Sequence, residues 1–211
     1  MKATLRLLGC CALAAQLGAC SILPKTEAPD IYRLPASQQP AAASPAVDWS
    51  LRVNAPKASQ ALDSNRIAVL PSGDLLSVYK GARWSDSAPA LLRDRLLDAF
   101  RADGRIQGLS SDAVNLQADL ELGGDLRAFQ SEYRNGHVET VITLEARLVR
   151  SANQRILATR HFEVRQPATD DKLPQVISAF GQAADRLAAQ VVGWTLQQGQ
   201  MQTLQRQALQ P

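Results

Sequence analysis

Two histidines, His137 and His161, are the imidazoles available in this chain for acid–base catalysis or metal binding. His137 follows an Asn-Gly turn signal, and His161 lies on the polar side of an alternating segment that predicts a strand. A catalytic triad needs such a base beside a nucleophile, but the sequence has no Gly-x-Ser-x-Gly elbow, phosphate-binding glycine loop or His-Glu-x-x-His motif. We therefore expect both histidines at the surface, no metal site, no cofactor and no enzymatic activity.

Acidic pairs are the other candidates for acid–base chemistry, namely Asp119 with Glu121 and Asp170 with Asp171. Asp119 and Glu121 are two residues apart in an alternating segment, so their side chains share one side of a strand. Like charges at this spacing are typical of a solvated sheet face, and not of the paired carboxyl groups of a glycosidase. A hydrolase stays as a third hypothesis, and it requires activity that is lost when either histidine is changed.

Acylation of Cys20 is the chemistry that the sequence predicts most directly. Residues 1–6 carry two positive charges, and residues 7–17 form an apolar run too short to span a bilayer, as in a signal peptide. The run ends in Leu17-Gly18-Ala19-Cys20, which resembles the bacterial lipobox. We expect removal of residues 1–19 and a fatty-acylated Cys20 at the new N-terminus; an ordinary signal peptide cleaved further along is the alternative.

The expected mature chain is nearly neutral. Cleavage removes two of the 23 basic residues and no acidic residue, which leaves 21 against 20. Basic runs no longer than two and few aromatic residues predict no nucleic-acid partner. Cys20 is then the one remaining cysteine, so no intramolecular disulfide forms. The second residue of the expected mature chain is Ser21 and not Asp. By resemblance to the sorting rule of enterobacterial lipoproteins, the absence of Asp favours transfer to the outer membrane. We therefore expect a protein that is lipid-anchored in the outer membrane and faces the periplasm.

Composition divides the rest of the chain into a tether, one domain and a tail. Residues 20–48 are rich in Pro and Ala and predict a partly extended tether, in which residues 31–34 have strand-forming side chains and are expected to dock as an edge strand. Residues 49–196 are long enough for one domain with a sizeable core. Residues 197–211 contain seven Gln in fifteen residues and are interpreted as a mobile terminus, with a frayed helix or a partner-binding segment as alternatives.

Hydrophobic periodicity predicts strands and two helices inside the domain. Alternating or continuous apolar runs predict strands over residues 49–53, 66–70, 75–79, 116–129, 137–149 and 156–164, of which the last three form an antiparallel meander. Gly123-Gly124 predicts a bulge or a bend in the first strand of that meander. The fold class is α/β in the broad sense (α+β), a single domain with a largely antiparallel sheet packed by two main helices.

The first helix is expected to begin at Ser85-Asp86-Ser87, to carry Pro89 in its first turn and to end at Gly104, whereas the second spans residues 171–196. In the first helix the polar residues Arg93, Asp94, Arg95 and Asp98 are placed on the side away from the sheet.

An aromatic segment, Tyr79-Lys80-Gly81-Ala82-Arg83-Trp84-Ser85-Asp86, is predicted to form the loop between a strand and the first helix. Two interpretations are compatible with each other. In one, Trp84 covers the end of the core while Asp86 or Ser87 caps the helix. In the other, Tyr79, Arg83 and Trp84 form a partner-binding patch, because such side chains are enriched at interface hot spots.

Read in order, these segments resemble the ABC-type transport auxiliary lipoprotein family, which includes the paraquat-inducible protein C lipoproteins. The matching pieces are the lipobox, residues 31–35, residues 62–67, residues 79–86, the strand around Phe162 and the helix closing on Gly193-Trp194.

The resemblance implies an accessory, docking subunit of an MCE-type envelope lipid transport system. Its implied partners are an MCE-domain protein and an inner-membrane permease or ABC transporter, and a homo-oligomer that matches a multimeric partner is an open alternative. A structural or assembly lipoprotein for an outer-membrane protein or secretion channel is the alternative function.

Overall fold

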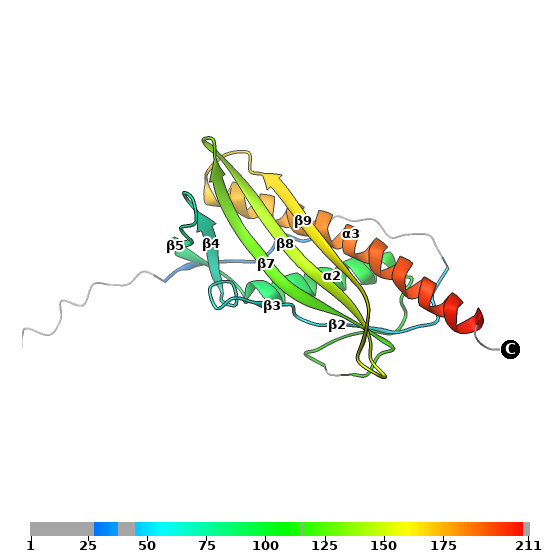
Figure 1. Cartoon of the computed structure of the whole chain (residues 1–211). Helices are drawn as coiled ribbons and strands as arrows, with labels where there is room; N and C mark the ends of the chain where they lie inside the picture. Colours follow the sequence, from blue (N-terminus) through cyan, green and yellow to red (C-terminus); the bar gives the residue numbers. More distant parts are fainter. Residues whose placement is uncertain (1–27, 38–44, 115, 209–211) are drawn as a thin grey trace, which may run out of the picture.

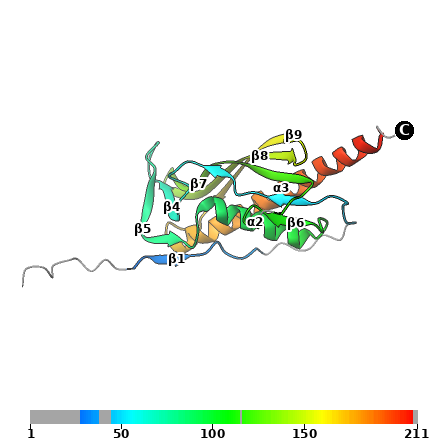
Figure 2. The same cartoon turned by 90° about the horizontal axis from the view of Figure 1, so that it is seen from below.

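The computed structural model describes residues 28–37, 45–114 and 116–208. The signal peptide and Cys20 lie outside these ranges. In this part of the chain a twisted sheet has two helices on one face (Figure 1), and strand β1 runs along the outer side of the helices (Figure 2). The prediction of one α+β domain with two main helices on a sheet is confirmed.

Three long strands form the centre of the sheet. They are β7 (Leu120–Arg134), β8 (His137–Arg150) and β9 (Arg155–Pro167), joined as an antiparallel meander. This confirms the predicted meander. Of the bulge or bend expected at Gly123-Gly124, the bulge is wrong in position, because the register shift lies between Leu126 and Ala128. Gly124 serves a close backbone approach instead: it has φ +149°, and a Cβ there would lie 2.0 Å from the carbonyl oxygen of Glu145.

The remaining strands make the sheet mixed. They are β1 (Asp30–Tyr32), β2 (Leu51–Val53), β3 (Lys57–Ala58), β4 (Arg66–Leu70), β5 (Ser77–Trp84) and β6 (Leu109–Ser111). The antiparallel pairing expected for the sheet holds for the meander and for β4 with β5, whereas several short parallel pairs were not expected. β2, β3 and β4 all pair parallel to β7, β6 pairs parallel to β2 and β1 parallel to β5, whereas β4 and β5 are antiparallel. Alternation along a strand assigns its faces but not its neighbours, which is why these long-range parallel pairs were missed.

Strand β5 extends further than predicted. The segment from Tyr79 to Trp84 is part of the strand and not a loop, and Gly81 within it adopts φ +69°. β1 docks beside β5 with Ile31 opposite Arg83, which confirms the expected edge strand in the tether.

Helix α2 (Ala88–Asp103) begins and ends as its sequence predicts. Ser87 is its N-cap residue and Gly104, at φ +76°, its C-cap. The carboxylate of Asp86 accepts a hydrogen bond from the backbone N–H of Ser87 at 2.7 Å, whereas Ser87 itself makes no side-chain cap.

Helix α3 (Leu173–Ala208) is longer than predicted, because the Gln-rich segment continues it past residue 196. Its 36 residues correspond to about 54 Å. Among the described residues, no helix has the combination of length and apolar character that crossing a membrane requires.

Candidate tether-docking site

Trp84 lies in the core between the sheet and the helices. It is 1% exposed and packs edge-on against Phe129 and Phe180, with ring centroids 5.9 and 5.1 Å away. The interpretation of Trp84 as a core residue is confirmed, so its ring offers no surface to a partner in this conformation.

Tyr79 and Arg83, the other two residues of the predicted patch, lie along β5. The Tyr79 hydroxyl is 3.0 Å from the Ser131 hydroxyl, and burial raises the pKa of Tyr79 to about 12, so the phenol stays neutral at physiological pH. Arg83 is exposed. A partner contact by these two side chains stays a prediction.

The histidines and the acidic pair form no catalytic group together. His137 is exposed at the β7–β8 turn, and His161 is exposed on β9 with Nδ1 2.6 Å from Glu145. Asp119 accepts hydrogen bonds from the backbone N–H and hydroxyl of Ser50, at 2.8 and 2.7 Å. Glu121 pairs with Arg52 at 2.6 Å. The two carboxylates thus attach β2, and the residue that precedes it, to the start of β7. The described ranges contain no cluster of three His, Cys, Asp or Glu side chains able to hold a metal ion.

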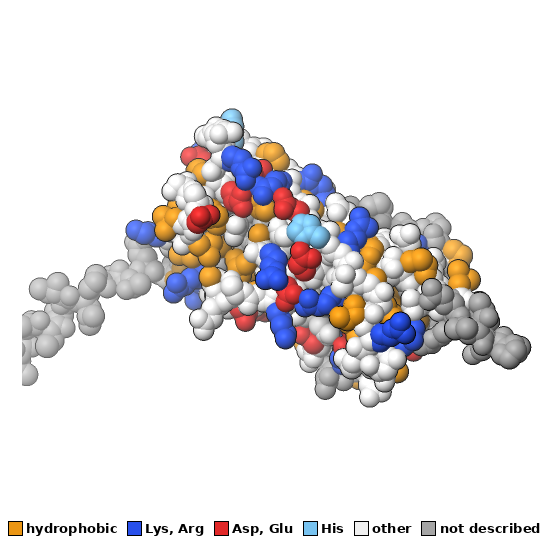
Figure 3. Space-filling view, viewed as in Figure 1, with side chains coloured by type: hydrophobic (Ala, Val, Ile, Leu, Met, Phe, Trp, Pro, Cys, Tyr) orange, Lys and Arg blue, Asp and Glu red, His pale blue; other side chains and the backbone are white. Residues whose placement is uncertain are grey.

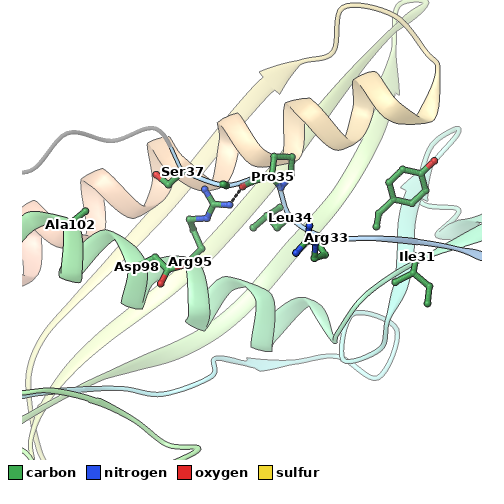
Figure 4. Close-up of a pocket in the computed structure, with 10 residues that line it drawn as sticks. Ile31, Arg33, Leu34, Pro35, Ser37, Arg95, Asp98 and Ala102 are labelled. Carbon is green, nitrogen blue, oxygen red and sulfur yellow. Dashed lines mark hydrogen bonds between the residues drawn. The ribbon is translucent and has the colours of Figure 1, made fainter.

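The tether makes a second attachment to the domain immediately after β1. We call residues 33–37 the N-terminal strap. The carbonyl of Tyr32 accepts a hydrogen bond from the N–H of Ser85 at 2.8 Å, and Leu34 packs against the core. The strap then passes between α2 and α3 on the side of the helices that faces away from the sheet (Figure 4).

Arg95 of α2 fastens this strap. Its guanidinium donates hydrogen bonds to the Pro35 carbonyl and to the carboxylate of Asp185 in α3, and the residue is only 5% exposed. Three segments far apart in the sequence therefore meet at one cation. The expectation that Arg95 lies on the solvent side of its helix is wrong, because the strap covers that side. Its partners lie 60 and 90 residues away, so no local pattern could have identified it.

Gly181 gives the strap its close contact with α3. A Cβ at this position would lie 2.9 Å from Cβ of Pro35 and 3.0 Å from its Cγ. Glycine in a helix interior costs about 1 kcal/mol relative to alanine. A glycine is needed here because the ring of Pro35 lies too close to α3 to leave room for a larger side chain.

A cavity of about 720 Å³ opens beside the docked strap. Residues 31–37 line one side, and Arg95, Asp98 and Ala102 of α2 line the other. Both charged residues from α2 have partners, since Asp98 pairs with Arg101 at 2.9 Å. The residues of this site hold part of the chain's own tether.

Ion pairs cover the sheet face that carries no helix, where they form a band of alternating charge (Figure 3). Arg165 contacts Glu132, Glu139 and Glu163 at 3.1, 2.8 and 2.7 Å. Burial alone would lower the pKa of Arg165, but the hydrogen bonds to these carboxylates have the larger effect, so the pKa is raised above its ordinary value. Burial likewise favours neutral Glu132, but hydrogen bonds from Gln130 and Arg165 hold its pKa below the usual range.

These features define a class of protein: an α+β domain whose helices clamp an N-terminal tether. The sequence profile of the family described as ABC-type transport auxiliary lipoprotein component matches residues 32–192. The chain belongs to this family, as its sequence pattern predicted. The description of this family is that of a lipoprotein component that is auxiliary to ABC-type transport.

Solved structures share the fold. Protein XCC0632 from Xanthomonas campestris is 35% identical, with a TM-score of 0.77 over 82% of this chain and 98% of that one. A second crystal structure, of an uncharacterized protein, is 17% identical with a TM-score of 0.61 over 79% of this chain and 97% of that one.

A curated relative from Bradyrhizobium diazoefficiens is 28% identical over 165 residues. The match covers 78% of this chain and 44% of the relative, so this chain spans less than half of that protein.

Proposed function

We propose that this chain is the membrane-anchored docking subunit of an MCE-type envelope lipid transport system. In this role it serves as the auxiliary component of an ABC transporter or permease, binds an MCE-domain protein and has no catalytic activity of its own. The observation that carries the proposal is the family match, which begins at residue 32 and therefore includes the strap together with the domain.

The strap supports a docking role by limiting how the domain moves on its anchor. A tether that stayed free to residue 48 would leave 28 residues between Cys20 and the domain. Because β1 pairs with β5, the chain is already attached to the domain at Asp30, ten positions after Cys20. A docking subunit gains from such restriction, since preorganisation lowers the entropy lost on binding. We propose that the anchor lies in the outer membrane and that the domain faces the periplasm.

The test is affinity purification of the full-length acylated protein from detergent-solubilised envelopes, with co-purifying proteins identified by mass spectrometry. Trp84→Ala is unsuitable as an interface variant because Trp84 is in the core. Arg83→Glu instead changes an exposed residue of the predicted patch, and Arg155→Glu makes the same charge change on exposed β9.

We expect wild type and Arg155→Glu to retain an MCE-domain protein and Arg83→Glu to lose most of it. Recovery of a barrel protein or secretion channel without any MCE-domain protein would contradict the proposal and favour an assembly role. Alanine at both His137 and His161 should leave function intact if the protein is not a hydrolase.

A further inference from the structure

The tip of the β4–β5 hairpin carries two adjacent leucines that the domain does not bury. Leu75 is 61% and Leu76 39% exposed, within the turn that follows Leu70. Hairpin turns are normally built from Gly, Pro, Asn, Asp and Ser, and residues 71–74 of this turn follow that rule. Neither leucine belongs to the hydrophobic core, so both are available for contact with something outside the domain.

The hairpin tip lies at the end of the domain from which the tether leaves. In two perpendicular views, β1 and the β4–β5 hairpin are at the same end, and the C-terminal end of α3 is at the other (Figures 1 and 2). Ile31 on β1 is also 60% exposed. In the space-filling view, hydrophobic side chains gather at this end over β4 and β5 (Figure 3).

The length of the tether brings this end close to the membrane. Asp30 lies ten positions after Cys20, and a fully extended chain of that length reaches about 35 Å at most. Several other exposed apolar side chains lie away from this end, among them Val114, Leu116 and Ile156. Leu116 precedes the start of β7, whereas β4 pairs with β7 at Gln130–Glu132, about ten residues further along that strand. The two leucines are therefore on the part of the domain that the anchor holds nearest to lipid.

Charge at this end is balanced, so the apolar side chains must make the contact. Lys80 and Arg83 are exposed, and the described residues provide neither with an ion-pair partner, in contrast to the paired arginines of the sheet face. Arg33 and Arg66 are also exposed beside these strands, and exposed Asp30, Asp63, Asp74 and Asp86 offset the four cations. Attraction to anionic headgroups is thus a minor contribution, and aliphatic insertion at the headgroup boundary is the mode that fits.

We propose that Leu75 and Leu76 insert into the interfacial region of the bilayer that holds the acylated Cys20, as a second attachment that sets the orientation of the domain. The inference rests on the lipid anchor of the proposed function, but not on any transport partner.

The experiment measures lipid contact at the hairpin tip. The full-length acylated protein, with its acylation checked by mass, carries a bimane label at Ser72→Cys. Since Cys20 is blocked by acylation and is the last cysteine of the mature chain, this label is unique. The protein is reconstituted into phosphatidylethanolamine and phosphatidylglycerol vesicles with or without brominated acyl chains. A label at Ala113→Cys, exposed beside Val114 and Leu116, is the matched control.

We expect brominated lipid to lower the fluorescence of the label at position 72 at least twofold and to leave the label at position 113 unchanged. Leu75→Ser with Leu76→Ser should abolish the quenching at position 72, whereas Val114→Ser with Leu116→Ser should not. Equal quenching at both labels, or none at position 72, would overturn the inference. Protection of position 72 from aqueous iodide without lipid quenching would overturn it as well, since a protein would then cover the tip. All these outcomes are read without a transport partner present, so they are independent of the purification test.

Discussion

Arg95 shows how one side chain can decide whether a tether is part of a domain. A buried arginine is costly unless each donor finds an acceptor, and here the acceptors come from α3 and from the strap. The cation therefore makes α2, α3 and the strap interdependent. Loss of its charge should loosen the strap and also leave Asp185, whose side chain is 21% exposed, without this partner.

We predict that Arg95→Met lowers the free energy of unfolding by about 2–3 kcal/mol. The value lies below the range for a fully buried pair because Asp185 is partly solvated. Urea denaturation measures the change, and Arg101→Met is the control on the same helix. Arg101 pairs with Asp98 at the surface, where such pairs contribute about 0–1 kcal/mol. Equal effects of the two substitutions would show that Arg95 does not fasten the strap.

The glycines of α3 allow a comparison within one element. Gly181 contacts Pro35, whereas Gly193 is exposed and has no atom within 4 Å of the position of a Cβ. We predict that Gly193→Ala stabilises the protein by about 0.5–1 kcal/mol, because alanine favours the helix and restricts the unfolded chain.

Gly181→Ala should lack this gain, because its methyl group displaces the strap, and hydrogen exchange of residues 33–37 should accelerate. Thermal unfolding of both variants with exchange mass spectrometry checks the pair. A stabilisation of equal size at the two positions, with no faster exchange in the strap, would contradict the close contact.

The ion pairs of the open sheet face predict how stability depends on pH. The pKa of folded Glu132 lies below its usual value, so the folded state binds fewer protons than the unfolded state. The stabilisation of the folded state by ionised Glu132 is complete above the unfolded pKa of about 4.3, and it is lost as the pH falls through the lower folded pKa. We predict that Arg165→Met is less stable than wild type at pH 7 and that the difference shrinks below about pH 4. Urea midpoints from pH 7 to 3 test this, and a constant difference would contradict it.

Strands and helices could be predicted where the pattern that indicates them lies within the segment itself. Residues 66–70, the meander and the caps of α2 follow from periodicity and turn residues, and the structure has them where expected. The parallel partners of β7 are 62 to 69 residues away in the sequence, and short strands such as Lys57–Ala58 have too few residues to show a period. Trp84 was ambiguous because an aromatic residue near a helix start suits a core and an interface equally well.

The whole molecule is organised from end to end. β1 and the β4–β5 hairpin are at one end, and α3 extends to the other (Figures 1 and 2). The sequence predicted the edge strand over residues 31–34, but not the contacts that hold the strap, since Arg95, Gly181 and Pro35 are assembled only by the tertiary fold. The sequence also predicted that the domain ends at residue 196, but α3 continues past this residue. Whether the residues after 196 belong to the domain can be tested.

Residues after 196 contact the body of the domain. A Cβ at Gly199 would lie 2.2 Å from the ring of Trp49, and Arg150 donates a hydrogen bond to Gln202 at 2.7 Å. Trp49 is 8% exposed, so removal of this turn uncovers a large aromatic side chain.

We predict that a chain ending at Leu196 loses about 2 kcal/mol of stability, or about 4–8 °C in Tm, and that a chain ending at Leu204 unfolds as the full chain does. Differential scanning calorimetry of the three chains tests this. If the chain ending at Leu196 kept its Tm, the segment would be free for a partner, as one sequence interpretation had it. A loss confined to that chain instead places the first two turns of the Gln-rich segment inside the domain, because the cover over Trp49 and the bond to Arg150 are then needed for its stability.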